Sequence, residues 1–406
     1  MSLNWQEEIS DAEKARSIQG LPSEESMVLY PSARSLLESQ ALFNEDRPFV
    51  KWLEGDEVRS ASYTELHNLG KQTANFLRTK KIMHDHRVIL NSRNNLETVA
   101  KHMGLWLEGA VAIPATGENN SNLAESVDPF PDGDFIKRIK QQSTDYELRQ
   151  KAKLSDDMIY FTAQNDRTIA LSHNNVLSGA LSNSLHLNIS EEDVIVCPMP
   201  MGDSFGFIAG LVTATYAGGT FAPCESEPME MCTLAAKTNA RWMLANNSLL
   251  SKLLDDADEY RPQLPDDLQF IAPADGLSSD MVLNVLNRLG CQTITGYFST
   301  ECSSFATLTP ADLDDSEYRS LFADSTVLPI GGGLQTTEAY IHDAKGSPVQ
   351  DKKFGELVIR GHTVMQRYVE DESGTGTAFR NGWLHTGRKG FKITLDENNV
   401  KFFLKN

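Results

Sequence analysis

A strand, a helix and a second strand follow one another between residues 87 and 114, and this pattern constrains the fold more than any other. Two short apolar runs, RVIL and VAIP, flank residues 96–107, which repeat apolar side chains at helical spacing and stop before Gly109. A strand–helix–strand unit pairs its strands in parallel through a right-handed crossover. The chain is therefore predicted to contain a parallel sheet covered by helices.

A later strand ends at side chains that suit a ligand. Residues 282–289 are apolar at helical spacing, Gly290 ends them, and CQTITGY is predicted to form a buried strand leading to a turn. The turn carries Tyr297, Thr300 and Glu301 at the carboxyl end of the strand, where open α/β sheets bind ligands. A ring can stack on a base, a hydroxyl can donate to phosphate, and a carboxylate can hold Mg²⁺. A short motif of this kind also occurs by chance, so an ordinary polar turn without a ligand is the alternative.

The acidic composition excludes one class of partner. The 406 residues carry a formal net charge of −19, and no dense run of Lys and Arg interrupts it, so no nucleic-acid-binding surface is expected. The five cysteines show no CxxC pair and no His/Cys ligand spacing, which predicts reduced thiols in a cytoplasmic protein. The first residues, MSLNWQEEIS, lack the apolar core of a signal peptide.

One stretch, residues 204–224, contains no charged side chain and is long enough to span a bilayer. It is rich in Gly, Ala and Thr and has a proline near its end, which favours a helix and a strand buried in a large core. No membrane span is therefore predicted.

The remaining elements keep an α/β texture up to about residue 330. Residues 48–63 predict a two-stranded hairpin that turns at 54–56, residues 63–81, 175–185 and 206–217 predict helices, and residues 194–197 predict a strand. Residues 116–157 are polar, with one helix near 134–142. After residue 328 the predicted strands are short and separated by glycines, which indicates a β-rich unit.

This texture predicts three parts. We expect a first α/β subdomain over residues 1–180, a second over 181–330 and a β-rich subdomain over 331–406. The strands at 87–90, 111–114, 194–197 and 294–297 should lie in one mostly parallel sheet covered by helices. Residues 355–403 should form a separate antiparallel unit.

Five segments then resemble one protein family, in its order and across nearly the whole chain. They are RSASYTELHNLGKQTANFLR, RVILNSRNNLETVAKHMGLWLEGAVAIP, GYFSTE, FGELVIRGHTVMQRYV and NGWLHTGRKG. They resemble the large N-terminal domain of the adenylate-forming superfamily, which includes acyl- and aryl-CoA synthetases, luciferases and peptide-synthetase adenylation domains. The resemblance implies an α/β fold with doubly wound, mostly parallel sheets in two subdomains plus a small antiparallel β subdomain. It also implies that a carboxylate attacks the α-phosphate of ATP, giving an acyl-adenylate and pyrophosphate.

The resemblance assigns roles to individual residues. Catalytic positions fall on Thr300 and Glu301, and Glu301 is also the implied metal ligand. Nucleotide-binding positions fall on Thr162, Arg167, Tyr297 and Arg388, and positions in the pocket for the acid fall on Asp203, Phe205 and Gly296. ATP and Mg²⁺ are the implied cofactors of an active site.

Several departures from the family pattern argue against full activity. The counterpart of the phosphate loop, residues 160–175, keeps its SHNN end but contains no glycine, so its backbone approaches phosphate less easily. Asp203 replaces a histidine, and its charge would repel an acid substrate. Phe298 replaces a glycine, and Arg388 replaces an aspartate that holds the ribose hydroxyls, although arginine cannot accept a hydrogen bond. The chain stops at KFFLKN, where the family continues into a mobile domain that carries a catalytic lysine.

Three alternatives stay open. Two are functions within the family, and the third is a generic α/β domain with coincidental motifs. In the first, the chain is an AMP-forming ligase that activates a small carboxylic acid, weak or inactive alone and completed by a C-terminal domain or carrier protein in trans. In the second, it is a degenerate family member that binds a ligand or a partner without catalysis. Because the glycine loop and the ribose aspartate are missing, we expect ATP·Mg to bind in the millimolar range or not detectably. The loss of several transition-state contacts would lower the rate of an enzyme by many orders of magnitude. The sequence specifies neither the acid nor the oligomeric state.

Overall fold

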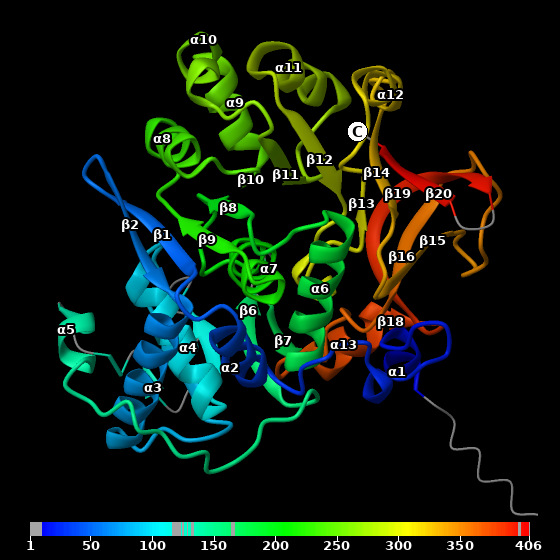
Figure 1. Cartoon of the computed structure of the whole chain (residues 1–406). Coiled ribbons are helices and arrows are strands. Elements are labelled where there is room, and N and C mark those ends of the chain that lie inside the picture. Colours follow the sequence, from blue (N-terminus) through cyan, green and yellow to red (C-terminus); the bar gives the residue numbers. More distant parts are fainter. Residues whose placement is uncertain are drawn as a thin grey trace, which may run out of the picture.

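The computed structural model describes residues 10–115, 123, 126–127, 129–130, 134–163, 167–396 and 399–405. These residues form three β-sheets with helices packed between and around them (Figure 1). Helix α6, His173–His186, lies near the middle of the molecule (Figure 1) and is hydrogen-bonded to Val364, to Thr213 and to Ser304.

The first sheet contains the strand–helix–strand unit predicted from residues 87–114. Strand β3, Arg87–Leu90, pairs in parallel with β4, Val111–Pro114. The connecting helix α4, Leu96–Glu108, begins at the capping residue Asn95 and ends at Gly109, whose φ is 75°. The sheet order is β17-β7-β6-β4-β3-β5, with β5 at Ser126–Val127, β6 at Asp157–Thr162, β7 at Thr168–Ser172 and β17 at Arg367–Tyr368.

The second sheet has the order β12-β11-β10-β8-β9-β1-β2, and its neighbours run parallel except in the β1–β2 hairpin. Its strands are β1 Pro48–Glu54, β2 Glu57–Ser62, β8 Val194–Cys197, β9 Thr220–Pro223, β10 Trp242–Leu244, β11 Gln269–Pro273 and β12 Gln292–Gly296. The prediction of one sheet is therefore wrong, because β3 and β4 lie in the first sheet and β8 and β12 in the second. A βαβ unit fixes the neighbours of its own strands but not the sheet that a later unit joins.

The β1–β2 hairpin forms as predicted and turns at Gly55, whose φ is 62°. It joins the second sheet although it precedes β3 in the chain, because β1 pairs with β9. Strands of the second sheet therefore come from both sides of the expected division near residue 180.

The third sheet is antiparallel, as its short strands and glycines predict. Its order is β13-β14-β20-β19-β16-β15, and β18 pairs with β19. The strands are β13 Thr307–Leu308, β14 Val327–Gly333, β15 Thr337–His342, β16 Gly355–Gly361, β18 Phe379–Arg380, β19 Trp383–Asp396 and β20 Asn399–Lys405. One expectation needs correction: residues 355–403 are not wholly separate, because β17 leaves this segment to pair with β7 of the first sheet.

Helices cover the sheets on their outer faces (Figure 1). Beside the first sheet lie α2 Ala33–Phe43, α3 Tyr63–Thr79 and α5 Phe135–Ile139, and around the second lie α8 Pro228–Thr238, α9 Asn247–Asp255, α10 Ala257–Tyr260 and α11 Ser279–Leu289. Shorter helices are α1 Asp11–Ala15, α12 Asp315–Leu321 and α13 Glu372–Ala378, with 3₁₀ turns at Ser23–Glu25, Arg261–Gln263 and Thr300–Cys302, the last labelled η5.

The helix predicted over residues 206–217 has an unusual first half. It is π-helical over η3, Phe205–Val212, and α-helical only over α7, Thr213–Ala217. The Thr213 hydroxyl donates to the carbonyl of Ile208 at 2.8 Å, five residues earlier. Wide helical turns of this kind occur frequently at functional sites.

Helix α6 is anchored by buried polar side chains. The Asn175 amide donates to the carbonyl oxygens of His362 and Val364, both at 2.8 Å. The hydroxyls of Ser182 and Thr336 lie 2.6 Å apart. Because buried polar groups stabilise a fold only when they are hydrogen-bonded, these contacts fix both the segment after β16 and the residue before β15 against α6.

The uncharged stretch at residues 204–224 is buried over most of its length in η3, α7 and β9, as predicted. In the part of the chain that the structure describes, no helix combines the length and the apolar character needed to cross a membrane.

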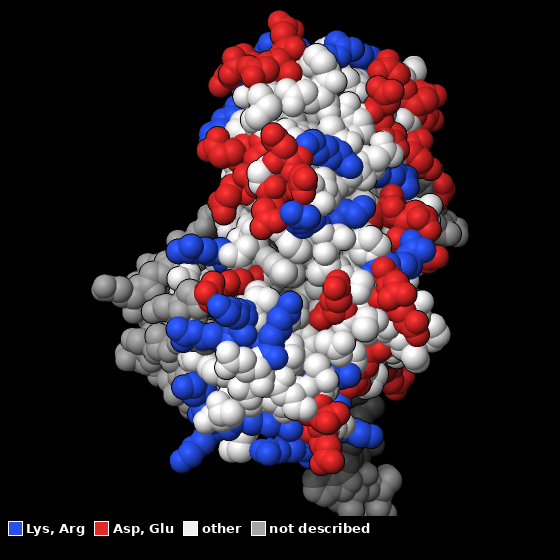
Figure 2. Space-filling model, turned by 60° about the vertical axis from the view of Figure 1, so that its left-hand side comes forward, with Lys and Arg blue, Asp and Glu red and all other residues white. Residues whose placement is uncertain are grey.

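Charged side chains are unevenly distributed over the surface. Figure 2 shows Asp and Glu gathered over the upper part of the molecule, and Lys and Arg mainly over the lower part. The upper part holds α8–α11 and the lower part holds α3–α5 (Figure 1). Positive side chains therefore gather locally although the net charge is −19.

Candidate functional site

The candidate site lies where β11 and β12 end side by side. Pro273 is paired with Gly296, and the amide of Ala274 donates to the Gly296 carbonyl at 2.8 Å. The carboxyl ends of neighbouring parallel strands form the edge at which α/β sheets bind ligands. The site predicted from residues 294–301 therefore stands at a favourable edge of the second sheet.

Packing explains the glycine at position 296. A Cβ on Gly296 would lie 2.1 Å from the carbonyl oxygen of Thr307 and 2.9 Å from Cδ1 of Phe305. Glycine allows this close approach between β12 and the chain that follows it. Gly296 thus holds the strand end in place, and its contact with an acid stays a prediction.

Tyr297 is nearly enclosed. Its residue surface is 8% exposed, and its hydroxyl lies close to the side chains of Ser299 and Thr386. Burial raises the pKa of Tyr297 well above its ordinary value, so the phenol is protonated at neutral pH. The ring offers a base little area for stacking in this arrangement.

Three aromatic rings fill the space beside the strand end. Phe205, at the start of η3, lies edge-on to Phe298 at 5.2 Å and to Phe305 at 5.9 Å between ring centroids, and Phe298 lies 5.3 Å from Phe305. Edge-to-face pairs of this kind are stabilising beyond their buried area. Phe298, which replaces the family's glycine, thus completes an apolar cluster next to the predicted acid pocket.

Asp203 has a local role that the sequence did not reveal. It is exposed, and its Oδ1 accepts a hydrogen bond from the Phe205 amide at 3.3 Å. The Ser204 hydroxyl also lies 3.4 Å from the same oxygen. Asp203 therefore caps the start of η3, where a negative charge is favoured by the free amides of the helix end.

Thr300 joins the strand-end turn to the start of η3. Its hydroxyl lies 2.8 Å from the hydroxyl of Ser204. Ser204 stands between Asp203 and Phe205 in the chain, and Thr300 follows Phe298 by two residues. Two hydroxyl groups are thus presented together beside Glu301.

Glu301, in η5, is held by the segment that contains β17. Its Oε1 accepts a hydrogen bond from the Tyr368 hydroxyl at 3.1 Å, and its carbonyl accepts one from the Met365 amide at 2.8 Å. Burial raises the pKa of Tyr368 to about 12, so the phenol remains a donor at neutral pH. The Glu301 carboxylate is therefore held in position by a neutral donor.

Arg167 reaches the same cluster from the start of β7. Its guanidinium lies 4.8 Å from the centre of the Tyr368 ring and 3.4 Å from the carboxylate of Asp371. Arg167 also hydrogen-bonds the Tyr368 hydroxyl. The structure therefore brings together Glu301 and Arg167, two residues predicted for the site, through a tyrosine that was not named for it.

Thr162 lies at the end of β6, opposite Thr168 in the β6–β7 hairpin. Next to it, the amide of Ala163 donates to the Arg167 carbonyl at 2.8 Å. The counterpart of the phosphate loop is therefore the top of a hairpin, and its residues 164–166 lie outside the described residues.

Arg388 forms an ion pair with Asp275. Asp275 follows β11, whereas Arg388 belongs to β19, so the pair links the second sheet to the third. The Arg388 amide donates to the hydroxyl of Thr386 at 3.1 Å, and Thr386 in turn contacts Tyr297. Both charged side chains are well exposed, so the pair itself contributes little to stability.

Sequence reasoning missed Ser204, Asp275, Tyr368 and Asp371 as site residues. Signals for two of them were present. Tyr368 ends the motif FGELVIRGHTVMQRY, and Asp275 lies in the turn two residues after the apolar strand Gln269–Pro273. Contacts between motifs, such as that of Tyr368 with Glu301, cannot be inferred from either motif alone.

The arrangement fits a magnesium ion held together with phosphates. Mg²⁺ is usually bound by one or two carboxylates plus phosphate oxygens, and Glu301 offers a single carboxylate next to the hydroxyls of Thr300 and Ser204. Among the described residues, a group of three metal-ligand types occurs elsewhere, at His84, Asp85 and Asp156, near the opposite end of β6 from Thr162.

Known proteins resemble this chain in sequence. A family model described as "AMP-binding enzyme" matches residues 168–369. The 2-succinylbenzoate–CoA ligase of Bacillus subtilis (strain 168) is 22% identical over 361 residues, which are 82% of this chain and 71% of that protein. The acyl-CoA ligase cnsG of Penicillium expansum is 25% identical over 238 residues, 56% of this chain and 47% of that protein. Several of the curated relatives are thus matched over less than half of their length.

Solved structures share the fold. The N-terminal domain of FACL13 from Mycobacterium tuberculosis superposes with a TM-score of 0.78 at 16% identity, covering 92% of this chain and all of that one. An adenylation domain from a keto acid-selecting peptide synthetase module superposes with a TM-score of 0.80 at 15% identity, covering 97% of this chain and 82% of that one. The predicted fold class, that of the large domain of adenylate-forming enzymes, is thereby confirmed.

The family model, the curated ligases and the shared fold agree with the five motifs of the sequence. The chain belongs to the adenylate-forming, AMP-binding superfamily.

Proposed function

We propose that this chain activates a small carboxylic acid as its acyl-adenylate, at the site formed by the ends of β11 and β12. The observation that carries the proposal is the contact of Glu301 with Tyr368, whose ring also holds Arg167. The carboxylate that we propose as metal ligand and the guanidinium that we propose as phosphate ligand both contact Tyr368. The matched relatives include ligases named for 2-succinylbenzoate and oxalate, which supports a carboxylic acid as the substrate.

The proposed reaction needs no proton transfer. A carboxylate oxygen of the acid attacks the α-phosphorus of ATP, and the bond from that phosphorus to the bridging oxygen breaks. Pyrophosphate leaves with the electron pair, and the acyl-adenylate remains. Bound Mg²⁺ would neutralise phosphate charge, with Glu301 as its protein ligand and Thr300 beside it.

Arg167 is suited to the leaving pyrophosphate. Its side chain is 42% exposed and is held by an exposed carboxylate, Asp371, and by the face of Tyr368. A guanidinium binds phosphate through charge-assisted hydrogen bonds, which are stronger than an exposed ion pair with a carboxylate. This contact would replace part of the binding that a glycine-rich loop provides, and Thr162, beside the hairpin turn, would donate a second hydrogen bond to phosphate.

Asp275 is the acceptor for the ribose in this proposal. Arg388 has only donors, whereas its ion-pair partner Asp275 can accept hydrogen bonds from ribose hydroxyls. The pair sits next to Thr386, which contacts Tyr297, the predicted partner of the adenine. The aspartate that the sequence lacks at position 388 would thus be supplied from the loop after β11.

The acid would bind beside the aromatic cluster of Phe205, Phe298 and Phe305, which favours an apolar or aromatic body behind the carboxylate. Asp203 does not oppose this placement, because its carboxylate is turned to the amide of Phe205 at the helix start. Its charge is therefore partly offset by the helix end.

Adenylation by this chain alone is expected to be slow. The partners that we propose are a C-terminal domain, which would bring the family's catalytic lysine to the site, and a carrier protein. The expected division at residues 180 and 330 remains part of the proposal. A cytoplasmic location is also proposed, because all five cysteines are free and buried.

A binding protein without catalysis is the second candidate. The specific observation in its favour is the enclosure of Tyr297, which leaves 8% of the residue exposed, together with the three rings packed beside it. In that case acids would bind at the aromatic cluster, and ATP would have no effect on them.

Acid-dependent exchange of pyrophosphate into ATP separates the two candidates. The assay would use the purified chain, Mg²⁺ and a panel of aromatic and short aliphatic acids, with Glu301→Gln as the test variant. Glu147→Gln removes the same charge from an exposed loop residue and is the matched control. Exchange that Glu301→Gln lowers at least a hundredfold, and that the control keeps, supports the ligase. No exchange with any acid, or equal exchange in both variants, contradicts it.

A further inference from the structure

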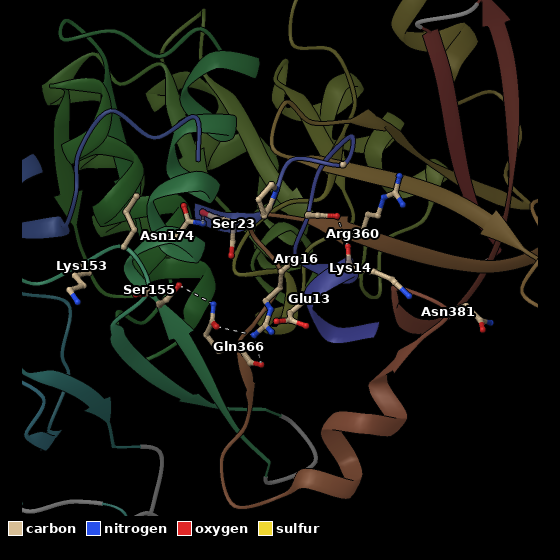
Figure 3. A pocket seen from close by; sticks show the side chains of 16 residues that line it. Glu13, Lys14, Arg16, Ser23, Lys153, Ser155, Asn174, Arg360, Gln366 and Asn381 are labelled. Atoms are coloured by element: carbon tan, nitrogen blue, oxygen red, sulfur yellow. Dashed lines mark hydrogen bonds between the residues drawn. The ribbon is translucent and has the colours of Figure 1, made fainter. Parts of the chain in front are cut away.

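An arginine near the start of the described chain binds the segment that holds Glu301. Nη1 of Arg16, the residue that follows helix α1, donates hydrogen bonds to the main-chain carbonyl of Gln366 at 3.1 Å and to its side-chain oxygen at 2.9 Å. The two residues are 350 positions apart in the sequence. They form part of the wall of a cavity of about 800 Å³, and Figure 3 shows their side chains facing each other. A charged donor thus binds two oxygen atoms of one residue.

Gln366 uses all of its polar groups in this arrangement. Its side-chain NH₂ donates to the Ser172 hydroxyl at 3.2 Å and to Oδ1 of Asn175 at 3.1 Å. Its main-chain amide donates to the Ala170 carbonyl at 3.0 Å. Because the NH₂ group is turned toward the end of β7 and the start of α6, the side-chain oxygen is left for the guanidinium. Arg16 therefore completes the bonding that fixes the orientation of Gln366.

The residues on either side of Gln366 hold Glu301. The Met365 amide donates to the Glu301 carbonyl at 2.8 Å, and the Tyr368 hydroxyl donates to the Glu301 carboxylate at 3.1 Å. Gln366 comes one residue after Met365 and two residues before Tyr368, so a shift of Gln366 moves both donors. The hydrogen bonds of Arg16 therefore act on Glu301 through a single residue of the chain.

The segment that carries Arg16 is also anchored at two further points, one on either side of it. The Asn381 amide donates to the Asp11 carboxylate at 2.9 Å, and the Asn174 side chain donates to the Ser23 carbonyl at 3.0 Å. Because these contacts do not depend on Arg16, the segment should stay in place when the guanidinium is removed. The contact of Asp11 offers a matched control, since its loss loosens the same segment at a different point.

We infer that Arg16 is a positioning residue of the proposed adenylation site, which acts through Gln366 on the two groups that hold Glu301. The inference rests on the proposed function, in which Glu301 is the protein ligand of Mg²⁺. Because Mg²⁺ demands near-ideal octahedral geometry, a displaced carboxylate binds it less well. Arg16 should thus set the Mg²⁺ requirement of the reaction. It should leave binding of the acid unchanged, since it takes no part in the aromatic cluster beside which the acid would bind.

Hydrogen exchange followed by mass spectrometry tests the positioning without any need for catalysis. The test variant is Arg16→Met, which keeps a long side chain but removes its donors, and the control is Asp11→Ala. In the peptide that covers residues 364–369, exchange should be at least about fivefold faster in Arg16→Met than in the wild type and unchanged in the control. Arg16→Lys keeps one charged nitrogen with several donors, so it should restore part of the protection.

Pyrophosphate exchange measures the consequence for the site. In Arg16→Met, the Mg²⁺ concentration for half-maximal exchange should rise at least about fivefold, while KM for the acid stays within about twofold of the wild type. The control should match the wild type in both quantities. A merely structural role of Arg16 would lower the amount of folded protein without changing the Mg²⁺ requirement.

Equal hydrogen exchange in Arg16→Met and Asp11→Ala would overturn the inference, and so would an unchanged Mg²⁺ requirement in Arg16→Met. A wild type that shows no pyrophosphate exchange with any acid contradicts the proposed function instead. In that case hydrogen exchange alone decides whether Arg16 positions the segment that holds Glu301.

Discussion

The hydroxyl of Tyr368 donates a hydrogen bond of 3.1 Å to the carboxylate of Glu301, although 67 positions separate the two residues. Tyr368 belongs to β17, the short strand that pairs with β7 instead of the third sheet. The neighbouring Met365 amide binds the Glu301 carbonyl. The strand that crosses between sheets therefore fixes the strand-end turn by both its backbone and a side chain.

Replacing Tyr368 by phenylalanine should weaken adenylation without unfolding the chain. The ring would still support Arg167, but the Glu301 carboxylate would lose its neutral donor. A hydrogen bond to a charged group contributes about 1.5–3 kcal/mol, so pyrophosphate exchange should fall about tenfold or more. The Mg²⁺ concentration for half-maximal exchange should rise as well. Tyr340→Phe, at a partly exposed tyrosine of β15, is the control, and equal exchange in both variants would refute the role of Tyr368.

Comparing ATP with an analogue that lacks the ribose hydroxyls tests whether Asp275 accepts hydrogen bonds from the ribose. If Asp275 accepts from the ribose, Asp275→Asn should raise KM for ATP about tenfold with little change in kcat. The wild type should prefer ATP over 2′,3′-dideoxy-ATP, and this preference should shrink in the variant. Asp280→Asn, at an exposed position in the first turn of α11, is the control. An unchanged preference in Asp275→Asn would show that the ribose binds elsewhere.

Gly296→Ala should be strongly destabilising, because its Cβ would meet the Thr307 carbonyl at 2.1 Å, and neither backbone can yield easily. Overpacking typically costs about 1–3 kcal/mol, and a backbone clash belongs at the upper end of that range. Gly376→Ala, in α13, is the matched control, since no heavy atom lies within 4 Å of its Cβ. Alanine there should be neutral or stabilising by up to about 1 kcal/mol. Urea unfolding of both variants checks the difference, and similar midpoints would contradict the packing argument.

The sequence predicted local structure better than assembly. Helix α4 was predictable because Asn95 and Gly109 mark its ends chemically, and the β1–β2 hairpin because Gly55 permits its turn. The sheet to which each strand belongs was not predictable from the sequence. Both β4 and β8 are short apolar strands, and their partners depend on packing between distant helices.

The site was predictable in part for the same reason. Tyr297, Thr300 and Glu301 stand on one turn, so their proximity follows from chain connectivity. The pairing of Arg388 with Asp275, and that of Glu301 with Tyr368, depends on how the second and third sheets and β17 meet. From the sequence alone, the replacement of the family's aspartate by Arg388 indicated only the loss of a ribose contact. The structure shows that Arg388 pairs with Asp275, which can accept hydrogen bonds.

Acid should destabilise this protein through a buried histidine. His102, on α4, is fully buried against Phe207 at 4.7 Å between ring centroids, and burial lowers the pKa of His102 to about 3. Neither ring nitrogen has a hydrogen-bond partner among the described residues. The unfolded chain binds the proton near the ordinary pKa of 6.5, whereas the folded chain does not. Stability is therefore complete above about pH 6.5 and is lost as the pH falls toward 3. Between pH 7 and pH 5 the loss should be about 2 kcal/mol.

His102→Leu should cost less than about 1.5 kcal/mol at pH 7.5 and should lose less stability than the wild type on acidification. Urea unfolding at both pH values measures the difference, and parallel pH profiles for the two proteins would show that His102 is protonated without unfolding.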